Sequence, residues 1–122
     1  MKYIVEKGKV EEKLEMPAER ALEFKARVFK VLGDPNRLRI IELLKDGERC
    51  QCEIIPLLDQ SQSTVSRHLR LLEEAGLIQS ERNGNRMLYQ VVDEGVFKIV
   101  DSLDDDLMRN LSHGLLSKLA PI

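Results

Sequence analysis

The sequence predicts a mainly α-helical domain with a two-stranded β-hairpin in its C-terminal third, followed by a last helix. Three observations lead to this prediction. Apolar residues recur at steps of three and four through most of the chain, as in amphipathic helices. Glycine and proline interrupt these stretches at intervals typical of globular helices. Between residues 77 and 92 the pattern changes to that of two strands around an Asn-Gly step.

The composition indicates one folded domain. Hydrophobic residues make up 43% of the 122 residues and charged residues 33%, which is typical of globular proteins. No stretch approaches the roughly 18–20 apolar residues that would span a bilayer, and the N-terminal "MKYIVEKGKVEEK" is too charged for a secretory signal. We therefore expect a cytoplasmic protein without membrane contact. Residues 1–16 lack clear periodicity and are expected to form an N-terminal arm before a domain at 17–122.

The first two predicted helices follow one another directly. The first occupies residues 18–32, between Pro17 and Gly33, with an apolar stripe of Leu22, Ala26, Phe29 and Leu32. The second begins with Asp34 as its cap and Pro35 at the first helical position, and it ends at Gly47. Its inward-facing residues are expected to be Leu38, Ile40, Ile41 and Leu44.

The next pair comprises a short helix and a longer, more regular one. Proline is tolerated only in a first helical turn, so Pro56 predicts that the short helix starts near Cys52 or Glu53. The longer helix runs from a cap at Ser61, or alternatively Asp59, to Gly76. Its expected buried stripe is Val65, Leu69 and Leu72, which leaves Gln62, Ser63, Ser66, Arg67 and Arg70 toward solvent.

The predicted hairpin and a last helix complete the chain. Asn83 and Gly84 are expected at the centre of a type I′ turn, where both residues need a positive φ. From residue 95 to 119 one long helix is expected, with a single apolar face of Phe97, Val100, Leu103, Leu107, Leu111 and Leu115.

The distribution of charge favours a nucleic-acid partner although the net charge is −2. Between residues 19 and 39 six basic residues face three acidic ones, and residues 61–70 contain two arginines and no acid. The acidic residues gather instead between 93 and 106. Because the local field decides which partner approaches a given surface, an acidic chain can still present a DNA-binding face.

The order of elements is that of a winged helix-turn-helix, with about five helices and a two-stranded wing. The start of the longer helix offers small hydroxyl residues and donors that fit a DNA major groove. The predicted DNA-binding residues on this helix are Gln62, Ser63, Thr64, Ser66, Arg67 and Arg70. On the hairpin they are Arg82, Asn83, Asn85 and Arg86. We expect a homodimer, because the two terminal amphipathic helices have more apolar surface than one small body covers, and a palindromic double-stranded operator.

Cys50 and Cys52, the two cysteines of the chain, allow three interpretations. They are small core residues, a redox dithiol, or a pair of thiolates that binds a soft metal or metalloid. A helix N-terminus lowers the pKa of a nearby thiol, which favours the last two. If Pro56 shifts the helix start to about Cys52, Cys50 lies on the non-helical lead-in, where both sulfurs can converge.

Three motifs in order resemble the ArsR/SmtB family of metal- and metalloid-responsive repressors. They are "LGDPNRLRIIELL", "RCQCEI", which is similar to the family's metal box, and "SQSTVSRHLRLLEEAGLIQSERNGNRMLYQV". The resemblance implies a dimeric winged helix that leaves its operator when an inducer such as As(III) or Cd(II) binds Cys50 and Cys52. No obligatory cofactor is implied.

The chain departs from that family at its sensory positions. Ile55 stands where arsenic-responsive members often have a third cysteine, and residues 1–20 contain no cysteine. The last helix has Asp101, Asp104, Asp106 and His113 without a paired-histidine spacing, so a solvated acidic face is the favoured interpretation there.

Enzyme functions are not favoured, because the chain has no Gly-rich phosphate loop, nucleophile–base pair or metal-hydrolase histidine pair. Two alternatives to the metal sensor stay open. One is a winged-helix regulator that responds to thiol oxidation or to no signal. The other is a winged helix that serves as a protein-interaction module.

Overall fold

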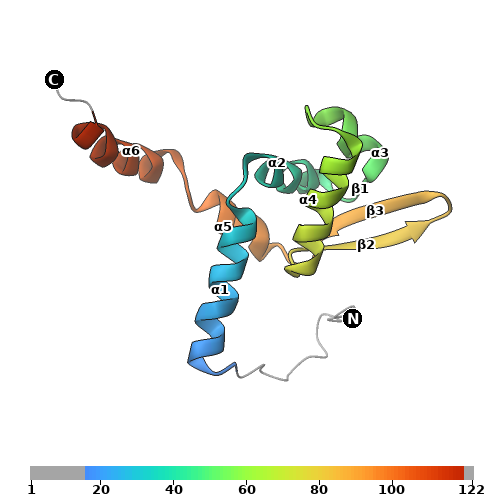
Figure 1. Ribbon diagram of the computed structural model, residues 1–122, viewed down its shortest axis with the longest axis horizontal. Helices are drawn as coiled ribbons and strands as arrows, with labels where there is room; N and C mark the ends of the chain where they lie inside the picture. The colour runs from blue at the N-terminus through green and yellow to red at the C-terminus, as the bar shows by residue number, and fades with distance from the viewer. Residues whose placement is uncertain (1–15, 120–122) are drawn as a thin grey trace.

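The computed structural model describes residues 16–119, so the expected N-terminal arm lies outside the described residues except for Met16. The hairpin projects from one side of a cluster of helices, and the last helix projects from the other side (Figure 1). The elements in chain order are α1 (Ala18–Leu32), α2 (Pro35–Leu43), β1 (Arg49–Cys50), α3 (Gln51–Ile54), α4 (Gln62–Glu74), β2 (Ile78–Asn83), β3 (Arg86–Val91), α5 (Gly95–Asp101) and α6 (Asp105–Leu119). The mainly helical winged fold expected from the sequence is confirmed.

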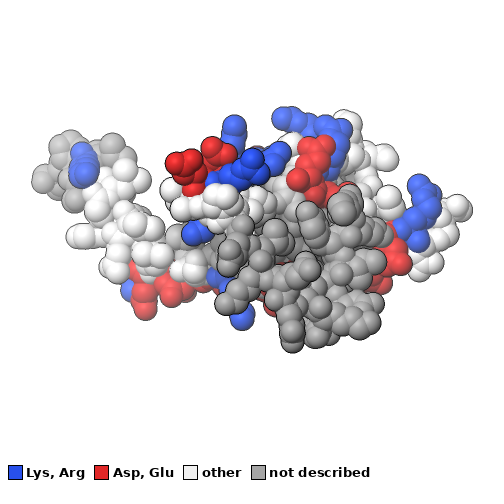
Figure 2. Space-filling model, turned by 90° about the horizontal axis from the view of Figure 1, so that it is seen from below, with Lys and Arg blue, Asp and Glu red and all other residues white. Residues whose placement is uncertain are grey.

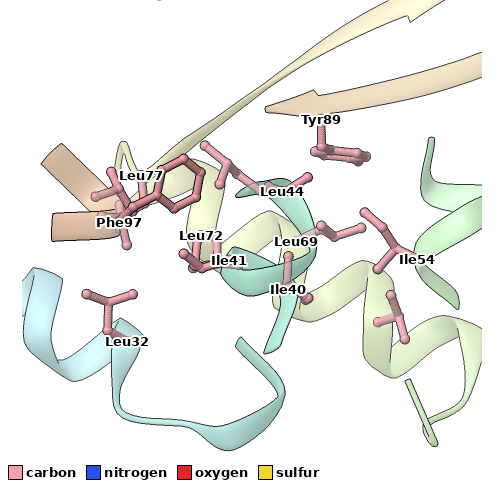
Figure 3. Packing of buried hydrophobic residues seen from close by; sticks show 14 of the residues in the cluster. Leu32, Ile40, Ile41, Leu44, Ile54, Leu69, Leu72, Leu77, Tyr89 and Phe97 are labelled. Atoms are coloured by element: carbon pink, nitrogen blue, oxygen red, sulfur yellow. The ribbon is translucent and has the colours of Figure 1, made fainter. Parts of the chain in front are cut away.

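One hydrophobic core joins α2, α4 and the base of the sheet. Ile40 and Ile41 of α2 are fully buried, as are Val65 and Leu72 of α4. Figure 3 shows α2 and α4 packed together, with Tyr89 of β3 and Ile54 of α3 closing the cluster on one side. Helices α2 and α4 are therefore fixed to the base of the hairpin through shared side-chain packing, which sets the position of α4.

The predicted helix caps of α2 and α4 are confirmed. The Asp34 carboxylate accepts hydrogen bonds from the backbone N–H groups of Asn36 and Arg37, at 2.8 and 3.2 Å. Ser61, and not Asp59, caps α4 by accepting from the N–H of Thr64 at 3.2 Å. These bonds satisfy helix-end donors that would otherwise lack partners, so each helix starts at a defined residue.

The hairpin differs from its prediction at the turn. Asn83 pairs with Arg86 across the strands, so the two central residues are Gly84 and Asn85. Gly84 has a φ of +64°, and no described residue other than glycine has a positive φ. The prediction of Asn83 and Gly84 as central residues of a type I′ turn was therefore wrong. One positive φ is sufficient because a type II′ turn needs it only at its first central residue, which here is Gly84.

The sheet has a third strand that the sequence analysis did not anticipate. Its order is β1-β3-β2, and both neighbouring pairs are antiparallel. In the short strand β1, Arg49 pairs with Tyr89 and Cys50 pairs with Leu88. The base of the hairpin is thus bonded to the segment that leads into α3.

Two helix boundaries also differ from expectation. The helix expected as one piece over 95–119 is divided into α5 and α6, because Asp104 accepts from the N–H of Leu107 at 2.8 Å and starts a new helix. The short helix starts at Gln51, before the expected Cys52 or Glu53, and Pro56 lies in the 3-10 turn Ile55–Leu57 that follows. Within residues 16–119, no helix has the length and apolar character needed to cross a membrane.

Candidate DNA interface and cysteine pair

Helix α4 has one face in the core and one face in solvent. Its inward residues Val65, Leu69 and Leu72 are buried as predicted. Its first turns expose Gln62 and Ser63, and further along it exposes Arg67 and Arg70; Thr64 and Ser66 are half-buried at the border. Arg70 lies 3.9 Å from the Glu74 carboxylate, whereas Arg67 forms no ion pair with any described residue. The outer face of α4 thus offers donors and hydroxyls to a partner.

The hydroxyl groups at the start of α4 form a local network. Ser61 Oγ lies 3.2 Å from Ser63 Oγ and donates to Thr64 Oγ1 at 2.9 Å. The Ser66 hydroxyl accepts a hydrogen bond of 2.6 Å from the side-chain amide of Gln51. Ser66 is therefore engaged by α3 in this structure, while Gln62 and Ser63 remain the outermost polar residues of the turn.

The hairpin tip is polar and basic, with Arg82, Asn83, Asn85 and Arg86 all exposed. Figure 2 shows basic side chains at the projecting hairpin end of the molecule and further basic side chains over the body. Arg86 Nη2 lies 3.2 Å from Glu53 Oε1, so one wing arginine is paired with α3. The hairpin and α4 pack on the same hydrophobic core. Both also form hydrogen bonds with α3: Ser66 of α4 with Gln51, and Arg86 of the wing with Glu53.

A buried contact links α4 to α2. His68 is 6% exposed, and its Nδ1 lies 3.1 Å from Nη1 of Arg37. A guanidinium group can only donate, so Nδ1 of His68 accepts and the imidazole proton resides on Nε2. Arg37 also donates through Nε to the carbonyl of Val31. His68 therefore packs and hydrogen-bonds at the buried flank of α4.

Cys50 and Cys52 are close together but differ in environment. Their Cα atoms are 5.1 Å apart and their sulfurs are joined in a disulfide. Cys50 is only 2% exposed, whereas Cys52 is exposed. Cys50 lies on the extended lead-in, with φ −69° and ψ 146°, so the predicted convergence of the two sulfurs is confirmed. One sulfur therefore belongs to the core and the other faces solvent.

Cys50 also caps α3 together with Glu53. The N–H of Cys52 donates to Cys50 Sγ at 3.0 Å, and the N–H of Cys50 donates to Glu53 Oε1 at 3.0 Å. This reciprocal pattern is a capping box. The same Glu53 side chain lies near two arginines, Arg86 at 3.2 Å and Arg49 at 3.7 Å. The cysteine segment is therefore held by backbone, carboxylate and strand contacts at once.

The sequence did not indicate the contacts that Gln51 makes with α4 and Glu53 makes with the wing. The spacing Cys50-x-x-Glu53 has the form of a capping box, and that signal could have identified Glu53. Nothing comparable pointed to Gln51, because its partner Ser66 is 15 residues away along the chain. Long-range side-chain contacts of this kind have no local pattern.

The donor set of the cysteine pair fits a soft ion only in part. Two sulfurs are the ligand type that thiophilic metals and metalloids prefer. Within the part of the chain that the structure describes, no group of three or more His, Cys, Asp or Glu side chains is arranged to hold a metal. The aspartates of α5 and α6 and His113 accordingly form no such group there.

A helix pair that exposes its second member beside a basic hairpin defines a winged helix-turn-helix DNA-binding domain. The family model described as "Bacterial regulatory protein, arsR family" matches residues 34–80. An uncharacterised HTH-type transcriptional regulator of Methanocaldococcus jannaschii is 40% identical over 81 residues, covering 66% of this chain and 91% of that protein. The arsenical resistance operon repressor of Staphylococcus xylosus is 39% identical over 77 residues, covering 63% and 74%.

Solved structures agree with these relatives. A homodimeric winged helix-turn-helix domain from Mycobacterium bovis, described as a possible ArsR-family regulator, superposes with a TM-score of 0.68 at 29% identity, covering 83% of this chain and 95% of that one. Reduced HlyU from Vibrio cholerae gives a TM-score of 0.63 at 26% identity, covering 70% and 90%. The chain belongs to the arsR family of bacterial regulatory proteins. It is a transcriptional regulator, not an enzyme.

Proposed function

We propose that this protein is a homodimeric repressor that leaves its operator when a thiophilic metal or metalloid binds Cys50 and Cys52. The observation that carries the proposal is the position of the two converging sulfurs, one on the lead-in to α3 and the other in its first turn, directly before α4. Relatives that share this fold are named as arsenical and cadmium resistance regulators, which supports an inducer of the same chemical class. We place its site of action in the cytoplasm, with the DNA.

The proposed DNA surface combines α4 with the wing. Gln62, Ser63, Thr64 and Arg67 enter the major groove of a palindromic half-site, with Ser66 and Arg70 at its margin. On the wing, Arg82, Asn83, Asn85 and Arg86 contact the neighbouring backbone. All of these side chains except the half-buried Thr64 and Ser66 are exposed, which supports the assignment. The first turn of α4 also supports it, because those of its N–H groups that Ser61 does not cap suit phosphate oxygens.

The proposed dimer uses the terminal helices. Leu22 and Phe29 of α1 are 67% and 62% exposed, and Leu111 and Leu115 of α6 are 57% and 56% exposed. Such apolar faces are rare on a monomer surface. The homodimeric state of the Mycobacterium bovis domain supports pairing across these helices. Two copies then present two α4 helices to half-sites about one DNA turn, roughly 10 bp, apart.

The proposed inducer chemistry starts from two thiols, which a dithiol reductant produces from the disulfide of the structure by thiol–disulfide exchange, itself becoming a disulfide. A trivalent arsenical oxide reacts with both: each sulfur loses its proton and bonds to arsenic, and the oxygen leaves as water. The described residues supply no third donor at this site, so an arsenical that bonds to two sulfurs fits best. Because Cys50 is buried and Cys52 is exposed, binding of one arsenic to both sulfurs displaces Cys52, which favours a change in the structure around α3.

A second candidate function is a redox-responsive regulator, and one observation favours it. Both cysteines are paired with each other in the structure, and no described cysteine is free. In that case the two thiols lose two protons and two electrons to an oxidant, and the disulfide form is the one with altered DNA affinity. Both candidate functions use the same cysteine pair and the same DNA surface, so they differ only in the reagent that acts on the sulfurs.

Operator binding in the presence of two reagents separates these functions. A duplex selected by the reduced protein from a random pool is titrated alone, with phenylarsine oxide, and with the thiol oxidant diamide. The metalloid proposal expects release by phenylarsine oxide, and the redox alternative expects release by diamide alone. The Cys50→Ser, Cys52→Ser double variant should bind DNA normally and ignore both. If the double variant still releases DNA with phenylarsine oxide, the sensor lies elsewhere.

A further inference from the structure

The two residues that flank Cys52 connect the cysteine segment to both DNA-facing elements. The Gln51 side chain donates to Ser66 of α4 at 2.6 Å. The Glu53 carboxylate lies 3.2 Å from Arg86 at the start of β3. Both flanking residues belong to α3, a helix of only four residues. A single short element thus touches the helix and the wing at once.

Cys50 is the fixed end of this segment. It is buried, it pairs with Leu88 of the central strand, and its N–H is bound by Glu53. Cys52 is the exposed end. Any chemical step that changes the separation of the two sulfurs therefore displaces Cys52 more easily than Cys50. Gln51 and Glu53 are covalent neighbours of Cys52, so they are displaced with it.

We infer that Gln51 and Glu53 are positioning residues that transmit the chemical state of the cysteine pair to α4 and to the wing. The inference rests on the proposed function, in which that pair is the sensory site. Hydrogen bonds of this length weaken steeply when the donor and acceptor separate or tilt. A small shift of α3 is therefore sufficient to break the Gln51–Ser66 bond and to change the Glu53–Arg86 contact.

The two links act on different parts of the DNA surface. Ser66 lies one turn after the exposed hydroxyl residues of α4, so losing its partner loosens the orientation of the helix start. Arg86 has a carboxylate partner in the free protein, and a DNA phosphate would compete for the same guanidinium. By linkage, the factor by which the state of the cysteine pair changes DNA affinity equals the factor by which bound DNA changes the equilibrium between those states.

The test compares Gln51→Ala with a matched change elsewhere on the sheet. Gln90 on β3 is exposed, and Gln90→Ala removes the same amide group without touching α3. Each protein is first reduced with a dithiol, which is then removed. Operator affinity is measured before and after reaction with one equivalent of phenylarsine oxide, and arsenical uptake is measured by the loss of free thiols. We expect the wild type and Gln90→Ala to lose affinity by a factor in the range of about 5 to 150.

Gln51→Ala should take up the arsenical as the wild type does, but the factor by which its operator affinity falls should be about fivefold smaller. One net hydrogen bond supplies a factor of about this size. Ser66→Ala and the Gln51→Ala, Ser66→Ala double variant should show the same reduced response as Gln51→Ala, because all three remove one contact. Glu53→Gln keeps an oxygen for the N–H of Cys50 but removes the charge that holds Arg86, and it should reduce the remaining response.

The outcomes separate failure of this inference from failure of the proposed function. A wild type that takes up the arsenical without losing DNA affinity overturns the sensory role of the cysteines, and the coupling with it. A wild type that responds while Gln51→Ala and Glu53→Gln respond equally overturns the coupling alone. Equal uptake in every variant, with a response reduced only in the α3 and Ser66 variants, supports the inference.

Discussion

At the scale of single residues, Cys50 combines two properties that the sequence presented as alternatives. It is a core residue by burial, and it is also one half of a bonded sulfur pair. Spacing along the chain predicted the convergence of the sulfurs but not the burial of one of them. That burial depends on the pairing of β1 with β3, which joins residues almost 40 positions apart. Contacts at this separation leave no periodic signal.

Arg67 is the residue whose replacement should affect DNA binding most specifically. It is exposed on α4 and pairs with no described carboxylate, so its guanidinium is available to a base edge. Arg67→Ala should cost about 1–3 kcal/mol of operator affinity and relax the preference at one base position. Fluorescence anisotropy with single-base operator variants measures both effects. Arg109→Ala, on the remote helix α6, is the control; equal affinities for the two variants would contradict the assignment.

Arg86 should behave differently, because it lies on the wing and is proposed to contact the DNA backbone. Arg86→Ala is expected to weaken all sequences alike and to reduce the slope of log K against log salt concentration by about one. Titrations at several salt concentrations, with the selected operator and an unrelated duplex, test this. Unchanged binding at low salt would show that the wing does not contact DNA.

At the scale of elements, amphipathic period and capping residues predicted α1, α2 and α4 well. The division between α5 and α6 was not predicted, since the apolar steps from Phe97 to Leu107 continue in phase across it. The deciding contact is local: the Asp104 carboxylate takes the N–H of Leu107 and restarts the helix. In the sequence this aspartate is one of several acids, so a capping role could not be told from a solvated acidic face.

Asp34 should show the value of a helix cap directly. Partial burial acts to raise the pKa of Asp34, but the N–H groups of Arg37 and Asn36 and the charge of Arg37 outweigh it, so the pKa lies below its ordinary value. A lowered folded-state pKa means that the stabilisation exists above the unfolded-state pKa and is lost as the pH falls through the folded-state value. Asp34→Ala should therefore lower the free energy of unfolding by about 1 kcal/mol at pH 7.

The same variant gives a check by pH. The difference between Asp34→Ala and the wild type should shrink as the pH falls through the lowered folded-state pKa of Asp34, because the wild type then loses its carboxylate charge at this position. Urea unfolding at fixed protein concentration measures it. Asp59→Ala, in the exposed loop before α4, removes a carboxylate that caps no helix and should leave stability unchanged. A pH-independent loss in Asp34→Ala would contradict the capping account.

At the scale of the whole molecule, α6 projects from the body with its apolar face uncovered (Figure 1). An open groove of about 600 Å³ lies where α6 leaves the body, with Phe29, Leu38 and Met108 among its lining residues. The sequence predicted this excess of apolar surface from two amphipathic helices at the chain ends. It could not predict their relative orientation, because that follows from the break before Asp105.

Leu111→Glu should dissociate the proposed dimer. A charge on the apolar face of α6 would be buried without a partner in the interface, which is costly. Sedimentation at micromolar concentration should show a monomer for Leu111→Glu and a dimer for the wild type. His113→Glu adds the same side chain on the opposite face of α6 and should remain dimeric. A dimeric Leu111→Glu variant would place the interface on other elements.

The short strand β1 also divides the hairpin into two regions of different local stability. Beside Leu88 and Tyr89 the sheet is three strands wide, whereas the pairs Arg82–Met87 and Asn83–Arg86 extend beyond it as a two-stranded ribbon. A two-stranded ribbon is marginally stable on its own. Amide hydrogens near the tip should therefore exchange with deuterium by local opening, long before those at the base, which open only when the domain unfolds. Because the tip opens at a low free-energy cost, the positions of its arginines can adapt to duplexes of differing groove width while the base of the hairpin keeps its strand register.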